Sequence, residues 1–64
     1  MNLNFKFALI RRGITQRQLA KLLGVHEASV SHWLYERWNA PPEMQKKISQ
    51  LLGVPEQELF GKSS

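Results

Sequence analysis

The feature that most constrains this chain is the very short connection Leu23-Gly24-Val25, which separates two stretches with helical apolar spacing. Each stretch presents three apolar residues on one face: Leu19, Leu22 and Leu23 before the connection, and Val30, Trp33 and Leu34 after it. Because Gly24 tolerates a positive φ, it can end the first helix and turn the chain at once. A connection this short forces the two helices to cross steeply, with the small Ala20 at the crossing.

The first helix of this pair has a well-defined start. Thr15 precedes Gln18 at the spacing of a capping box, in which the threonine hydroxyl bonds the Gln18 backbone and the Gln18 side chain reaches back. The second helix, over about 26–35, begins at His26 or Glu27, and histidine is a poor cap. We therefore expect that helix to lose some stability at its N-terminal end.

Glycine and proline divide the rest of the chain into further helical segments. The first segment covers about 4–12 and ends at Gly13. A later segment begins at Pro42 and ends at Gly53, and a short last turn follows Pro55. We expect each of these segments to bury one apolar face.

Strands are not expected, because no stretch alternates apolar and polar residues as a half-buried strand does. The chain has 64 residues, which is enough for one small domain. The sequence therefore predicts a single, compact, all-α domain of five short helices over 1–64, with a loose tail over 61–64.

Composition narrows the possible functions. Nine lysine and arginine residues oppose five acidic ones, and the net charge of +4 indicates a polyanionic partner. The absence of cysteine excludes disulfides, thiolate metal sites and a cysteine nucleophile. No apolar run approaches the roughly 20 residues of a membrane span, and the start lacks a signal-peptide core. We therefore expect a cytoplasmic protein that does not contact membranes.

Catalytic and metal sites are not expected either. His26 and His32 fall on different sides of a helix, whereas a zinc pair needs a spacing near four and further ligands. Glu56 and Glu58 have no basic partner suited to acid–base work. The chain contains no glycine-rich phosphate loop and no nucleophile motif. The sequence therefore predicts no enzyme activity, no metal, no cofactor and no small-molecule substrate.

The order of residues from the capping box onward resembles the helix-turn-helix of the Cro and C1-type phage repressor family. The matching residues are Thr15-Gln16, Leu19-Ala20, Leu23-Gly24-Val25, Val30-Ser31 and Trp33-Leu34, followed by Pro42-Glu43-Met44, Ile48, Leu51-Leu52-Gly53-Val54 and Leu59-Phe60. The similarity covers about residues 3–60, with the helix-turn-helix itself at about 15–35. It implies a five-helix, lambda-repressor-like DNA-binding domain.

Two positions depart from that family's pattern. Position 36 is often glycine in the family, whereas this chain has Glu36, so we expect the turn after the third helix to be wound differently. Position 26 often holds Ser or Thr, whereas this chain has His26. The departure at His26 places an unusual group at the end of the helix that is expected to face DNA.

The resemblance implies that the third helix lies in the major groove with its N-terminal part nearest the bases. The expected base-reading residues are His26, Glu27, Ala28, Ser31 and His32. Glu27 can accept a bond from cytosine N4, and Ala28 can contact a thymine methyl. His32 can donate to guanine N7 or O6, or accept from an amino group, depending on its tautomer. For Glu27, a base contact and a purely stabilising effect at the helix start are both open.

Phosphate contacts are expected on either side of the third helix. The expected residues are Gln16, Arg17, Ser29, Tyr35, Arg37 and Asn39. Gln16 resembles a phosphate ligand of the family, because its side chain and the free N–H groups at a helix start can bind an anion. Trp38 is expected to be partly buried beside this loop.

These expectations together predict a sequence-specific, double-stranded-DNA-binding protein. It would be a transcriptional repressor or regulator of phage or mobile-element type, acting as a homodimer that forms in solution or only on DNA. The alternative is a protein-interaction module, antitoxin-like or binding a regulator, that uses the same fold with weak or no DNA binding.

Overall fold

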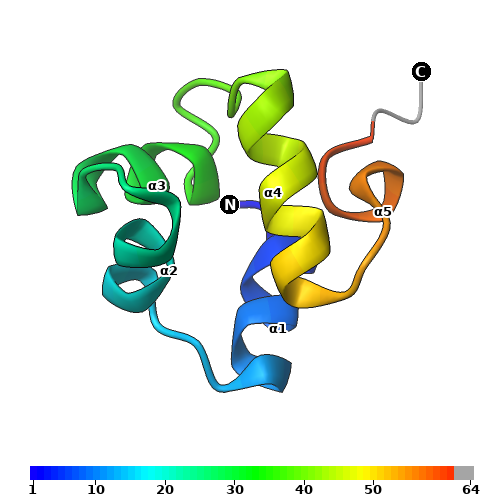
Figure 1. The fold of residues 1–64 in the computed structure, drawn as a ribbon. Coiled ribbons are helices and arrows are strands. Elements are labelled where there is room, and N and C mark those ends of the chain that lie inside the picture. The colour runs from blue at the N-terminus through cyan, green and yellow to red at the C-terminus, as the bar shows by residue number, and fades with distance from the viewer. Residues whose placement is uncertain (62–64) are drawn as a thin grey trace.

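The computed structural model describes residues 1–61 and folds them into helices alone. The helices are α1 (Leu3–Arg12), α2 (Gln16–Leu23), α3 (Glu27–Leu34), α4 (Pro42–Leu52) and α5 (Glu56–Phe60). Figure 1 shows α2 and α3 on one side of the molecule, α4 across its centre in front of α1, and α5 on the opposite side. The predicted all-α architecture is confirmed.

The expected tail over 61–64 lies largely outside the described residues, because positions 62–64 are not among them. Gly61 is described, and it is held to the last helix: its N–H donates to the carbonyl of Gln57 at 2.8 Å. Position 61 therefore caps α5, and the expected tail stays a prediction.

One face of every helix contributes to the core. The buried apolar residues are Phe5, Ala8, Leu9, Leu19, Ala20, Leu23, Val30, Trp33, Leu34, Ala40, Ile48, Leu52 and Leu59. Leu22 was expected in the apolar stripe of α2, but its side chain is 60% exposed. The buried face of α2 consists of Leu19, Ala20 and Leu23, so the small Ala20 faces the core. Leu22 therefore falls outside that face.

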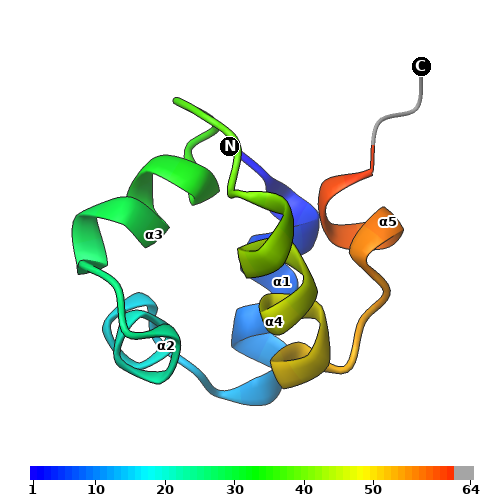
Figure 2. The same cartoon turned by 45° about the horizontal axis from the view of Figure 1, so that its top comes forward.

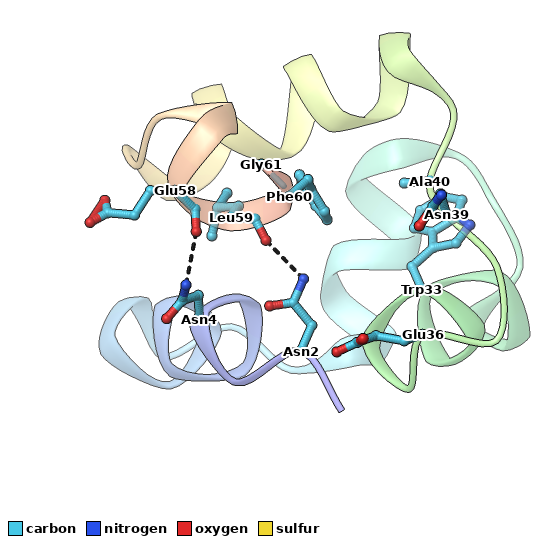
Figure 3. A pocket seen from close by; sticks show the side chains of 10 residues that line it. All are labelled: Asn2, Asn4, Trp33, Glu36, Asn39, Ala40, Glu58, Leu59, Phe60 and Gly61. Atoms are coloured by element: carbon cyan, nitrogen blue, oxygen red, sulfur yellow. Dashed lines mark hydrogen bonds between the residues drawn. The ribbon is translucent and has the colours of Figure 1, made fainter. Parts of the chain in front are cut away.

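Asn2 fixes the N-terminal end of α1 to two other helices. Its Oδ1 accepts from the N–H of Phe5 at 3.1 Å, which caps α1 and starts it at Leu3. Its Nδ2 donates to the carbonyl of Leu59 at 2.8 Å, as the dashed line in Figure 3 shows, and its N–H donates to the carbonyl of Leu34 at 2.7 Å. The end of α3 is thus held against α1 and α5.

The other end of α1 is held to α4 by Arg12. Its Nε donates to the carbonyl of Leu52 at 3.1 Å, across the turn at Gly53. Gly53 has a φ of +68°, and a Cβ there would lie 2.6 Å from the Arg12 guanidinium. Glycine therefore suits this turn by its conformation, and a Cβ would oblige the flexible end of the Arg12 side chain to shift.

Candidate nucleic-acid interface

The α2–α3 pair has the geometry that the sequence predicts. Thr15 Oγ1 accepts from the N–H of Gln18 at 3.1 Å, and Gln18 Oε1 accepts from the N–H of Thr15 at 3.0 Å, so both bonds of the capping box are made. Gly24 follows α2 with φ +71°, and the N–H of Val25 donates to the carbonyl of Ala20 at 3.0 Å. The turn therefore closes α2 and starts α3 at a fixed angle.

The two faces of α3 are separated as expected. Val30, Trp33 and Leu34 are buried in the core. The expected base-reading residues occupy the remaining surface: His26, Glu27 and Ala28 are exposed, whereas Ser31 and His32 are half-buried. This surface carries one carboxylate, two imidazoles and the short side chains of Ala28 and Ser31.

Glu27 and Arg17 form an ion pair across the two helices. Arg17 Nε lies 3.7 Å from Glu27 Oε1, and the two side chains are 85% and 52% exposed. A pair this open to water contributes little to stability. It does place a cation next to the carboxylate, which lowers the repulsion that Glu27 would meet near phosphates.

His32 is stacked on Trp38. The two ring centroids are 3.9 Å apart and the ring planes are inclined by 32°. Nδ1 of His32 is buried and has no hydrogen-bond partner among residues 1–61. Trp38 is nevertheless one of the exposed aromatic residues, with 55% of its surface accessible, so the expected partial burial is wrong. No local sequence pattern pairs these two residues, since they come from a helix and from the loop after it.

The expected phosphate ligands lie on two segments that flank α3. Figure 2 shows α2 beside the beginning of α3, and the segment leading to α4 at its other end. Gln16 and Arg17 begin α2, ahead of its first intrahelical bond, from Leu19 to Thr15 at 2.9 Å. Their N–H groups therefore have no partner within the helix. On the other segment, the exposed residues are Tyr35, Arg37 and Asn39. Ser29, within α3, is half-buried.

A helix-turn-helix family model, HTH_3, matches residues 5–59 and so spans the chain from α1 to α5. The chain belongs to the Cro/C1-type helix-turn-helix family. The resemblance seen in the sequence is thereby confirmed, and so is the five-helix fold class. The family is one of DNA-binding domains and not of enzymes, so DNA is the partner that it implies. No curated protein and no solved structure gives a significant match.

The turn that ends α3 has a left-handed position, where glycine is usual, but this position is occupied by Glu36. Glu36 has φ +61°. Its N–H donates to the carbonyl of Trp33 at 3.2 Å, and the N–H of Arg37 donates to the carbonyl of His32 at 2.9 Å. This is the bonding of a Schellman motif, in which the left-handed position is normally glycine. The expectation of a differently wound turn is therefore wrong: the core positions the chain as a glycine would, at the expense of strain at Glu36.

The start of α3 departs from the family in the expected way. His26 occupies the cap position, and its side chain makes no capping bond. The first bond of this turn runs from the N–H of Ser29 to the carbonyl of His26 at 3.0 Å. The N–H groups of Glu27 and Ala28 therefore have no partner within the helix, at the end expected to be nearest the bases.

The domain also has a cavity away from the exposed face of α3. An open cavity of about 520 Å³ lies between the start of α1, the end of α3 and α5 (Figure 3). Two amide side chains that line it, Asn2 and Asn4, donate to the carbonyls of Leu59 and Glu58 at 2.8 and 3.0 Å. These two bonds link the start of α1 to α5.

The described part of the chain contains neither a cluster of metal ligands nor a membrane-spanning helix. Within residues 1–61, no three histidine or acidic side chains come close enough to hold a metal ion. Over the same residues, no helix has the length and apolar character needed to cross a membrane.

Proposed function

We propose that this domain binds double-stranded DNA sequence-specifically, as a transcriptional repressor or regulator of phage or mobile-element type. The observation that carries the proposal is the division of α3 into a face buried by Val30, Trp33 and Leu34 and an opposite face of polar and small side chains. A helix in the major groove reads base edges with polar groups and small apolar groups of this kind. The formal charge of +4 supports a polyanionic partner.

Base reading is assigned to the open face of α3. The proposed residues are His26, Glu27, Ala28, Ser31 and His32. Ala28 is exposed near the start of the helix, where a methyl contact with thymine is possible. Glu27 is suited to accept from cytosine N4, and its pairing with Arg17 at 3.7 Å makes a carboxylate tolerable near phosphates.

Phosphate binding is assigned to the segments that flank α3. The proposed residues are Gln16, Arg17, Ser29, Tyr35, Arg37 and Asn39. Gln16 and Arg17 offer free N–H groups at a helix start, where the helix dipole also favours an anion. Arg37 is exposed just beyond α3 and can reach the backbone next to the bases that α3 contacts.

The domain is proposed to act as a homodimer in the cytoplasm, formed in solution or only on DNA. One domain of this size buries little surface on DNA, so two copies are needed for tight binding. A two-fold dimer would bind a near-palindromic site whose half-sites are one helical turn apart.

In vitro selection of bound duplexes from a random pool tests this proposal. A near-palindromic consensus is the expected result. A salt titration with the selected duplex should then show log Kd rising with log salt concentration, because bound phosphates release counterions. Duplex binding that cannot be detected even at low salt would instead favour the alternative, a protein-interaction module.

A pair of variants separates phosphate contacts from general charge. Arg37→Ala should weaken binding to every sequence about equally and lower the salt slope by about 1. Lys47→Ala, which removes an exposed cation from α4, is the matched control and should leave the slope unchanged. Equal effects of the two changes would remove Arg37 from the interface.

A further inference from the structure

The stack of His32 on Trp38 bears on which tautomer of the neutral imidazole faces the DNA. A neutral imidazole carries one N–H donor and one acceptor nitrogen, and the partners around the ring decide which is which. In this domain Nδ1 is buried without a hydrogen-bond partner among the described residues, and the centroid of the imidazole lies 3.9 Å from that of the Trp38 ring.

The burial of Nδ1 favours one tautomer over the other. A buried N–H that finds no acceptor is rare in folded proteins, whereas a buried acceptor without a donor is less so. Placing the proton on Nδ1 would create such an orphaned donor. Placing it on Nε2 leaves only a lone pair at Nδ1 and puts the N–H on the nitrogen that is not among the buried, unpartnered atoms.

We propose that Trp38 is a positioning residue that holds His32 as the Nε2–H tautomer, so that α3 presents a donor to the major groove. This inference rests on the proposed function. A donor at this point selects a base acceptor and discriminates against the amino groups of cytosine and adenine. Guanine is the preferred base, because it offers both N7 and O6 as acceptors on the same edge.

The tautomer can be measured in the free protein, without DNA. Nitrogen-15 chemical shifts and long-range couplings of the imidazoles distinguish Nδ1–H from Nε2–H. His32 is expected to be almost entirely Nε2–H, whereas the exposed His26 should show a mixture of tautomers set by water. In Trp38→Ala, His32 should move toward the pattern of His26. An Nδ1–H signal for His32 in the unmodified domain would overturn the proposal.

Base preference supplies the second readout. Selection with the unmodified domain should enrich guanine at one position in each half-site, and His32→Ala should abolish that preference. Trp38→Ala should reduce it about tenfold with the other positions unchanged, and Trp38→Phe should restore it, because a phenyl ring can also stack on the imidazole. Phe7→Ala, which removes an exposed aromatic side chain from α1, is the control and should leave the guanine preference intact.

The two readouts separate failure of this inference from failure of the proposed function. If no duplex is selected at all, the DNA-reading function falls, while the tautomer of His32 is still decided in the free protein. If a palindrome is selected but the position that responds to His32→Ala prefers cytosine, the donor assignment is wrong. A Trp38→Ala domain that keeps the full guanine preference would remove Trp38 as a positioning residue.

Discussion

Helices α2 and α3 have the same length, eight residues each, yet their ends are built very differently. α2 begins with both bonds of a capping box at Thr15 and ends at Gly24 in the left-handed conformation. α3 begins at His26, which makes no capping bond, and its closing turn places Glu36 in the left-handed conformation. The ends of α2 follow local preferences, whereas both ends of α3 go against them.

The difference indicates that tertiary packing, and not local sequence, determines where α3 starts and stops. Val30, Trp33 and Leu34 anchor α3 in the core, and the carbonyl of Leu34 accepts from the N–H of Asn2 at 2.7 Å. Conflicts between local preference and the fold tend to occur where a surface serves a ligand. The poorly capped helix is also the one proposed to read DNA, so this domain follows that tendency.

The largest expected effect comes from removing an anchor of α3. Trp33→Ala should lower the free energy of unfolding by about 3–5 kcal/mol, because it empties a large volume in the core. That loss is comparable with the whole stability of a domain this small, for which roughly 0.05–0.15 kcal/mol per residue is typical. Urea unfolding followed by circular dichroism measures it. Leu22→Ala, on the exposed side of α2, is the control and should cost less than about 0.5 kcal/mol.

A smaller effect, of opposite sign in the two helices, comes from the left-handed positions. Gly24→Ala should destabilise the domain by about 1 kcal/mol, because a Cβ is strained at φ +71° although the space around it is open. Glu36→Gly should stabilise it by about 1 kcal/mol through relief of the same strain. The exposed ion pair of Glu36 with the Met1 ammonium, at 3.7 Å, is too weak to reverse that sign. Unfolding midpoints that shift the same way in both variants would contradict this account.

The N-terminal caps should differ by a similar or slightly smaller amount. Thr15→Ala removes a cap that is made and should cost about 1 kcal/mol. His26→Ser supplies a cap that is missing and should add about 0.5 kcal/mol. Thermal unfolding of the two variants checks both values. If His26→Ser raises stability but weakens binding to the selected duplex, His26 contacts DNA. If binding is unchanged, His26 only occupies the cap position of α3.

The smallest expected effect is that of the ion pair between the two helices. A double-mutant cycle with Arg17→Ala and Glu27→Ala should give a coupling energy below about 0.5 kcal/mol, because both side chains are largely exposed. The cycle is measured by urea unfolding at low salt and repeated at high salt, where the coupling should vanish. A coupling above about 1 kcal/mol would mean that this pair, and not the core, aligns α2 with α3.

Residues whose partners are near in sequence could be predicted without the structure. The capping box of Thr15 and Gln18 and the left-handed Gly24 depend on contacts within a few residues, and both were found as expected. The exposure of Leu22 could not be predicted in this way, because which side of α2 is buried depends on how the other helices pack against Ala20. The bond from the Asn2 amide to the carbonyl of Leu59 gave no signal either, because the two residues are 57 positions apart.

The sequence by itself determined the all-α class, the α2–turn–α3 unit and which residues of α3 face the core, because helical periodicity and turn chemistry are local properties. The positive net charge and the outer face of α3 could also be read from it, although the roles of individual residues there remain proposals. Only the tertiary structure decided the winding of the turn at Glu36 and the surroundings of His32, whose Nδ1 is buried and whose ring stacks on Trp38. Both depend on where the packed core places the end of α3, and packing energy large enough to override a local preference is a property of the whole fold.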